Sequence, residues 1–272
     1  MRFEAPRSVE EAVTALAGQT GAQVLAGGTD LLVKLRAEMI EPELIFDIKR
    51  IEGMREIVAE DGGWRIGAAV SGAEMGEHAG LVADWPGVVE AAGLIGSTQV
   101  QGRATLAGNL CNASPAADSV PAMVAAGAVA RIVGPGGTRD LAVIDVPKGP
   151  GKTALEPGEF IASILLPAKP PQSGDAYLRF IPRSEMDIAV VGCGVSLSLD
   201  DEGRVTAARV ALGAVGPKVI LVEAAAEALK RRVLDEAALA DLAAACSKAA
   251  TPIDDKRGTV DFRRHVAGVL AR

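Results

Sequence analysis

The chain has 272 residues, of which 49% are hydrophobic and 23% charged, a composition typical of globular rather than disordered proteins. This length is enough for a large core and predicts more than one domain. The net charge of −7 argues against broad nucleic-acid binding, which needs a basic face.

The cysteines and histidines do not form a pattern that is typical of a metal site. Cys111, Cys193 and Cys246 are far apart in the chain, and the only histidines are His78 and His265. The sequence therefore predicts no metal site and no iron–sulfur cluster held by this chain alone. Free thiols suit a reducing cytoplasm, and no apolar run resembles a signal core or reaches membrane-spanning length. We expect a cytoplasmic protein without a transmembrane segment.

The first fifty residues predict a helix, a strand, a second helix and a second strand. Ser8 and Glu11 are spaced as a capping box before the first helix, and Gly18 is expected to end it. The next three elements are expected at 23–26, from Leu31 onward, and at 44–48. The segment 27–30 therefore joins the end of a strand to the start of a helix.

Residues 54–171 predict an alternation of short strands and helices. The expected strands are 64–70, 129–133 and 159–166, and the expected helices are one that begins at the capping box Ser71–Glu74, 88–94 and 119–126. The stretch 105–118 has the pattern of neither a helix nor a strand and is expected to be a loop.

The run Lys169–Gly174 is the best linker candidate, because it is rich in proline and ends on glycine. Beyond it the expected elements are two strands within 177–199, a strand at 205–212, and helices at 219–231, 235–248 and 260–270. Strands followed by helices predict a compact α+β module. We expect domains at 1–171 and 172–272, the first with subdomains of about 1–53 and 54–171.

Two loops carry the residue types of a phosphate-binding site. Gly27-Gly28 lies at a strand-to-helix turn, where unpaired backbone N–H groups meet the positive end of a helix dipole. The stretch 105–118 offers small residues and short hydrogen-bonding side chains, which allow close approach of a ligand. The Rossmann fingerprint is absent, and ordinary turns remain the alternative for both loops.

Two aspartates in these loops have competing interpretations. Asp30 would repel a phosphate, so we expect it to turn away and cap the helix from Leu31. Asp118 suits hydrogen bonds from ribose-like hydroxyls, but it also suits the N-cap of a helix from Ser119. Arg103 is the one cation expected near the two loops, and it could equally be solvated.

In this order, these segments resemble the FAD-binding subunit of the molybdenum hydroxylases, relatives of xanthine dehydrogenase and aerobic carbon monoxide dehydrogenase. The resemblance covers nearly the whole chain and is carried by 26–31, 42–47, 104–118, 149–159 and 183–190. Two departures stand out. Gln101-Gly102 replaces a common Arg-Asn pair, and Ala107 replaces the first glycine of a Gly-Gly pair. A methyl group at 107 fits only if φ is negative.

The resemblance implies an α+β fold: a two-subdomain FAD-binding domain of the PCMH/vanillyl-alcohol-oxidase-like type, then a C-terminal module of antiparallel strands plus a helical bundle. It implies that two loops hold the FAD pyrophosphate, here Leu25, Ala26, Gly27, Gly28, Thr29, Asp30, Leu31, Thr105, Ala107, Gly108 and Asn109. Further FAD contacts are implied for Ile95, Ser114, Asp118, Ile161 and Arg179. Arg179 would lie near the flavin ring and favour the anionic reduced flavin; no other catalytic residue is expected.

The resemblance also implies an electron route through partner subunits. Substrate is hydroxylated at a molybdenum cofactor on a large subunit, and electrons cross 2Fe-2S clusters of a small subunit to FAD and then to an outside acceptor. A heterotrimer that can dimerise is expected. Neither the substrate nor the acceptor (NAD, quinone or oxygen) can be read from the sequence, nor can a role for His78, His265, Tyr177 or Cys111.

Two other functions remain open at this point. A free-standing FAD-dependent oxidoreductase would need its own acid–base pair beside the loops, and no convincing pair is evident. A non-enzymatic nucleotide-binding assembly subunit would bind another phosphate ligand and would purify without a yellow chromophore.

Overall fold

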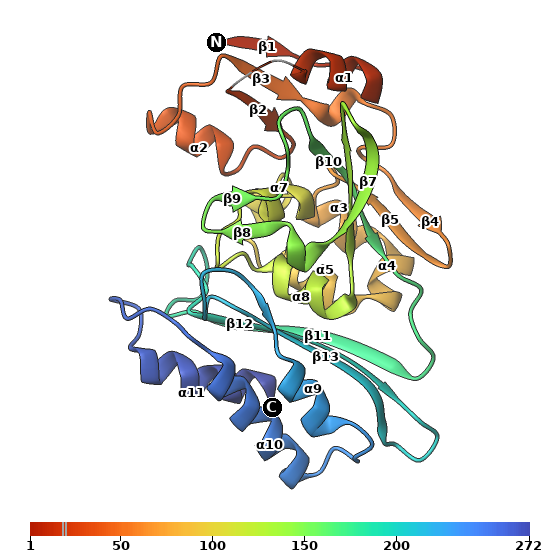
Figure 1. The fold of residues 1–272 in the computed structure, drawn as a ribbon, viewed down its shortest axis with the longest axis vertical. Coiled ribbons are helices and arrows are strands. Elements are labelled where there is room, and N and C mark those ends of the chain that lie inside the picture. The colour runs from red at the N-terminus through yellow and green to blue at the C-terminus, as the bar shows by residue number, and fades with distance from the viewer. Residues whose placement is uncertain (18, 20) are drawn as a thin grey trace.

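The structure is a computed structural model that describes residues 1–17, 19 and 21–272, so the expected helix end at Gly18 lies outside the described residues. The three larger of the four sheets in the described residues follow one another along the long axis of the molecule, each with its own helices (Figure 1). The N-terminus lies beside the first sheet, and the C-terminus lies among the helices that cover the last. The expected α+β fold class is confirmed.

A three-stranded parallel sheet occupies the N-terminal end. Its strand order is β1 (Arg2–Glu4), β3 (Leu44–Asp47) and β2 (Ala22–Leu25). Its helices are α1 (Val9–Leu16), α2 (Leu31–Arg36) and the single 3₁₀ turn η1 (Ile48–Arg50). The Ser8 hydroxyl accepts from the Glu11 N–H at 3.1 Å, but the Glu11 carboxylate accepts from the Arg7 N–H instead of Ser8. The expected capping box is therefore half formed.

A five-stranded antiparallel sheet forms the middle of the molecule. Its strand order is β4 (Ile57–Glu60), β5 (Gly63–Gly67), β10 (Phe160–Leu166), β6 (Val129–Gly134) and β7 (Gly137–Ala142). The chain between these strands forms α3 (Gly72–Glu77), α4 (Ala79–Asp84), α5 (Pro86–Gly93), α6 (Thr98–Gln101), α7 (Leu106–Cys111) and α8 (Ser119–Ala126). A 3₁₀ turn η2 (Val143–Asp145) and a small hairpin of β8 (Pro147–Gly149) and β9 (Lys152–Thr153) complete it.

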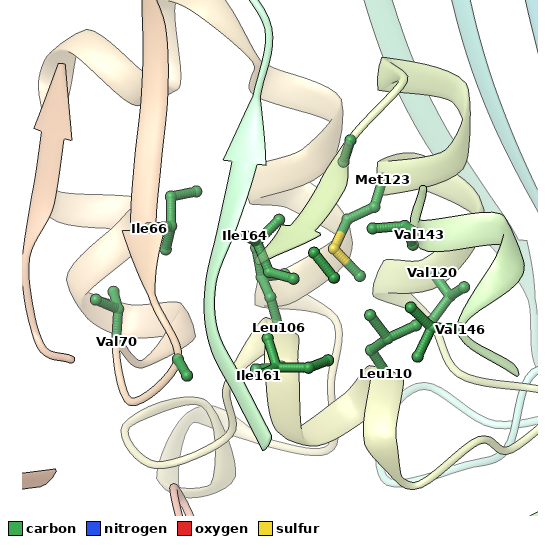
Figure 2. Packing of buried hydrophobic residues seen from close by; sticks show 14 of the residues in the cluster. Ile66, Val70, Leu106, Leu110, Val120, Met123, Val143, Val146, Ile161 and Ile164 are labelled. Carbon is green, nitrogen blue, oxygen red and sulfur yellow. The ribbon is translucent and has the colours of Figure 1, made fainter. Parts of the chain in front are cut away.

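The main core lies between this sheet and helices α7 and α8. Figure 2 shows Ile66, Ile161 and Ile164 from β5 and β10 beside Leu106, Leu110, Val120 and Met123 from the two helices. Every residue of α8 is buried and all but Ser119 are apolar, as expected of a helix enclosed between layers. The core therefore fixes α7, and with it the second loop of the expected site.

A four-stranded antiparallel sheet begins the C-terminal part. Its strand order is β11 (Ser173–Phe180), β12 (Val191–Leu199), β13 (Val205–Gly213) and β14 (Ile220–Leu221). Helices α9 (Glu223–Leu229), α10 (Glu236–Ala249) and α11 (Val260–Ala271) cover one face and share a second core with it (Figure 1). Helix α8 packs against the opposite face.

Two sequence expectations are wrong in detail. The stretch 105–118 is not all loop, because it contains the helix α7. The helix expected at 219–231 begins only at Glu223, after the short strand β14. Within the expected linker run, Lys169 Nζ donates to Asp175 Oδ1 at 2.9 Å and lies 5.1 Å from the centre of a Trp85 ring. No helix in the described part of the chain is both long enough and apolar enough to span a membrane.

Candidate functional site

A cavity of about 380 Å³ lies where the three-stranded sheet, α2, α7 and β10 meet. Both loops singled out in the sequence line it. The expected site residues among its lining are Ala26, Gly27, Gly28, Thr29, Asp30, Leu31, Ile95, Thr105, Ala107, Gly108, Asn109 and Ile161. Four others do not line it: Leu25, Ser114, Asp118 and Arg179.

The two loops touch through backbone, which requires glycine at residue 27. A Cβ on Gly27 would lie 1.8 Å from the Arg103 carbonyl oxygen, so no side chain fits without separating the loops. Gly28 has φ of +81°, a conformation that favours glycine. Lys49 Nζ donates to the Ala26 carbonyl at 3.0 Å and pairs with Asp47 at 2.8 Å, which fixes the first loop from below. The Arg103 side chain is exposed and does not line the cavity.

The second loop is organised by the cap of α7. Thr105 is its N-cap, and its hydroxyl accepts from the Gly108 N–H at 2.9 Å. Ala107 is buried within the first turn and is not among the described residues with positive φ. A methyl group at residue 107 requires a negative φ, and Ala107 meets this requirement because it lies in ordinary helical geometry.

Neither aspartate caps a helix. Asp30 makes no capping hydrogen bond, and its Oδ1 accepts from Asn112 Nδ2 at 3.1 Å. Asp118 also makes none, because Asn109 takes this role for α8: its Oδ1 accepts from the N–H and the hydroxyl of Ser119, at 3.2 and 2.7 Å. Both capping expectations are wrong.

Asp118 instead joins the central part of the chain to the four-stranded sheet. Its Oδ1 accepts from the Tyr177 hydroxyl at 3.0 Å, and its Oδ2 accepts from Arg179 Nη1 at 2.8 Å. Burial raises the pKa of Asp118 to about 6, although the neighbouring Arg179 and Tyr177 act in the opposite direction. Tyr177 is buried too, and burial raises its pKa well above the usual range. Ser114 is exposed, and its hydroxyl accepts from the Ala116 N–H at 3.3 Å.

The sequence interpretation did not predict five polar or charged residues of the cavity lining as site residues: Gln23, Lys34, Asn112, Thr153 and Glu159. Lys34 lies one helical turn after Asp30, so the i,i+4 spacing along α2 is a signal that could have found it. Asn112 belongs to the second loop, but the sequence pattern assigns it no specific contact. Cys111 also lines the cavity, where burial raises its pKa to about 12 and keeps the thiol protonated.

Neither histidine lines the cavity. His78 caps α4, since its Nδ1 accepts from the Leu81 N–H at 3.1 Å, and its ring packs against Trp64. His265 lies on α11. Among the described residues no group of three or more His, Cys, Asp or Glu side chains could hold a metal ion.

The cavity fits the cofactor that the sequence resemblance implies. Gly27 lets the two loops meet through backbone, and Gly28 turns with a positive φ, so this strand-to-helix turn can present backbone N–H groups, as a bound diphosphate requires. Ile95, Ala107 and Ile161 provide apolar surface for a ring system. The residues present therefore suit FAD.

Two family models match the chain in succession. The FAD binding domain in molybdopterin dehydrogenase matches residues 1–169, and the CO dehydrogenase flavoprotein C-terminal domain matches residues 176–272. The carbon monoxide dehydrogenase medium chain of Afipia carboxidovorans is 32% identical over 99% of this chain and 93% of its own length. The xanthine dehydrogenase FAD-binding subunit of Escherichia coli is 29% identical over 97% of this chain and 91% of its own length.

The solved structures agree with these relatives. The carbon monoxide dehydrogenase of Hydrogenophaga pseudoflava superposes with a TM-score of 0.94 at 32% identity, covering 100% of this chain and 94% of the matched chain. A quinoline 2-oxidoreductase from Pseudomonas putida gives a TM-score of 0.91 at 28% identity, with coverage of 100% and 94%. The chain therefore belongs to the molybdenum hydroxylase family as a FAD-binding medium subunit of the xanthine dehydrogenase and carbon monoxide dehydrogenase type, a flavoprotein subunit of an oxidoreductase.

Proposed function

We propose that this chain carries electrons within a molybdenum hydroxylase complex, from the 2Fe-2S clusters of a small subunit through FAD to an outside acceptor. The observation that carries the proposal is the cavity, which both expected FAD loops line and where they meet at Gly27. The similarity to subunits called medium chains supports a complex with a molybdenum-cofactor large subunit and a 2Fe-2S small subunit. A heterotrimer in the cytoplasm, able to dimerise, is the arrangement we expect.

The cavity would hold FAD at its central diphosphate and at its flavin ring. Residues 25–31 and 105–109 would take the diphosphate, while Ile95 and Ile161 would contact the flavin ring. When bound, FAD supplies the ability to accept electrons and to release them to another molecule. The chain itself binds, orients and shields the cofactor.

Asp118 and Arg179 would act on FAD from behind the cavity lining, with Ser114 as a further contact. The buried ion pair between them fixes the position of the Arg179 guanidinium on β11, at the boundary between the central and C-terminal parts. A fixed cation near the flavin stabilises negative charge on it, which raises its reduction potential. We propose that Arg179 tunes the flavin in this way and that Asp118 holds it in place.

A mixing experiment tests the electron route. The chain loaded with FAD is mixed, without oxygen, with the pre-reduced 2Fe-2S small subunit of its own complex, from which free reductant has been removed. We expect the yellow flavin absorbance to be lost in proportion to the reduced clusters added. Flavin that remains oxidised beside reduced clusters in an assembled complex would refute the electron-transfer role.

A further inference from the structure

One charged side chain of the cavity has no assigned role, the ammonium group of Lys34. It lies on α2 at the cavity wall and donates from Nζ to Asn112 Oδ1 at 2.7 Å. Asn112 follows the last turn of α7, and its Nδ2 donates to Asp30 Oδ1 at 3.1 Å. The amide of Asn112 therefore stands between a cation and an anion, and all three residues line the cavity.

The charge of Lys34 is not neutralised within the described part of the chain. No carboxylate oxygen there lies within 4.0 Å of its ammonium nitrogen, and its one hydrogen bond is to a neutral amide. An ammonium group has three N–H donors, so Asn112 uses one of them. A half-buried cation that keeps donors beside a cavity is stabilised by an anion placed there.

Lys34 is the cation of the cavity lining, and neither of the two acidic lining residues forms an ion pair with it. Among the described residues it is the one lysine or arginine that lines the cavity. Glu159 lines it as well, but its carboxylate is paired with Arg139 at 2.7 Å. Asp30 is occupied by Asn112 and lies one helical turn from Lys34 on the same helix.

We propose that Lys34 is the cationic ligand of the FAD diphosphate and that Asn112 is a positioning residue for it. The proposal rests on the proposed function, since it takes FAD as the occupant of the cavity. Asn112 is neutral, so the ammonium group can turn toward a phosphate without breaking an ion pair. Its amide also keeps Asp30 from pairing with Lys34, which preserves the positive charge for the ligand.

If the hydrogen bond between Lys34 and Asn112 served only to hold α2 against α7, the expected result would differ. If Lys34 and Asn112 only tie α2 to α7, removing the ammonium lowers the stability of the FAD-free chain. The dependence of FAD affinity on salt would then stay as it is in the wild type. If Lys34 pairs with phosphate, salt screens that pair, and the variant without it loses part of the salt dependence.

The test is a titration of the full chain with FAD, followed by flavin fluorescence at several KCl concentrations. Lys34→Met should weaken FAD binding about tenfold or more and reduce the slope of log Kd against log salt. Lys34→Arg keeps the positive charge, so it should retain most of the FAD affinity and most of the salt dependence of the wild type. Arg36→Met is the matched control, because this exposed residue lies on the same helix and does not line the cavity.

A Lys34→Met variant with the affinity and the salt slope of Arg36→Met would overturn the proposal. So would an unchanged salt slope together with a lower melting temperature of the FAD-free variant, since that outcome belongs to a mechanical bridge. Failure of the wild-type chain to bind FAD at all would instead refute the proposed function, which keeps the two failures distinct.

Discussion

At the scale of single residues, the proposed tuning of the flavin depends on Arg179. Its guanidinium group is buried and held by Asp118 at 2.8 Å. In Arg179→Met the cation is lost, so reduction of bound FAD should become less favourable. We expect the midpoint potential to fall by about 30 mV, equivalent to about 1.4 kcal/mol for a two-electron couple. Spectroelectrochemical titration measures this value.

Arg183→Met is the control for this potential, because Arg183 is an exposed arginine in the connection between β11 and β12 and pairs only with Asp187 among the described carboxylates. It should leave the potential within experimental error of the wild type. A potential that is the same in Arg179→Met and Arg183→Met would rule out the tuning role.

The buried carboxyl of Asp118 predicts a pH dependence of stability. Its pKa in the folded chain is about 6, above the ordinary value of 3.8. The folded state therefore binds this proton more tightly than the unfolded state, so its contribution to stability falls as the pH rises from about 4 to about 6. Two pKa units correspond to about 3 kcal/mol.

The Asp118→Asn variant has no titratable carboxyl at this position, so its unfolding free energy is the reference for the wild type at each pH. Urea unfolding of both proteins between pH 4 and pH 7 should show the wild type losing about 3 kcal/mol relative to the variant across that window. A difference between the two proteins that is constant over the whole range would show that the carboxyl does not titrate near pH 6.

Sequence reasoning found the residue types of the site but not all of their contacts. The glycines at 27 and 28 could be read from the sequence, because a Gly-Gly turn between a strand and a helix has a local signature. Lys34 and Asn112 are 78 positions apart, and Asp118 and Tyr177 are 59 apart. Such contacts form only when elements distant in the sequence pack together, so no local sequence pattern predicts them.

At the scale of elements, helix α8 packs closely on the four-stranded sheet because two glycines of that sheet have no side chain. A Cβ on Gly194 of β12 would lie 2.5 Å from the Pro121 carbonyl oxygen, and one on Gly213 of β13 would lie 2.7 Å from Pro121 Cγ. The helix can therefore lie directly on the strands, which brings Asp118 at its start within reach of β11.

Gly194→Ala should force α8 away from the sheet. We expect a loss of about 1–3 kcal/mol in the free energy of unfolding, as for other overpacked cores. Gly174→Ala on β11 is the matched control, since nothing lies within 4 Å of its added Cβ, and it should change stability by less than about 0.5 kcal/mol. Equal stability of the two variants in urea unfolding would contradict this account of the packing.

The elements that were predicted well have strong periodic patterns, and those that were missed do not. Helices α10 and α11 and strands β12 and β13 follow their expected ranges within a few residues. Helix α7 was expected to be a loop because Gly108 and Asn109 are poor helix formers; the Thr105 cap and burial of Leu106 and Leu110 stabilise it. Strand β7 is an exposed edge strand and lacks an apolar face.

At the scale of the whole molecule, the cavity lies between the three-stranded and five-stranded sheets, and none of its described lining residues comes from the four-stranded sheet. The buried cluster of Asp118, Tyr177 and Arg179 is a polar connection between β11 and the start of α8. A change in the C-terminal sheet can therefore reach the start of α8 through this cluster. The resemblance in the sequence could predict the overall arrangement, whereas the contacts across the sheets required the structure.

The central claim is that this chain works as the flavin subunit of a molybdenum and iron–sulfur complex. Purification of the native complex, followed by flavin, molybdenum and iron analysis of the same fraction, tests it most directly. The account predicts one FAD for each copy of this chain, together with molybdenum and iron in the partner subunits. A chain that purifies from its native source as a monomer, free of molybdenum and iron partners and without flavin, would contradict it.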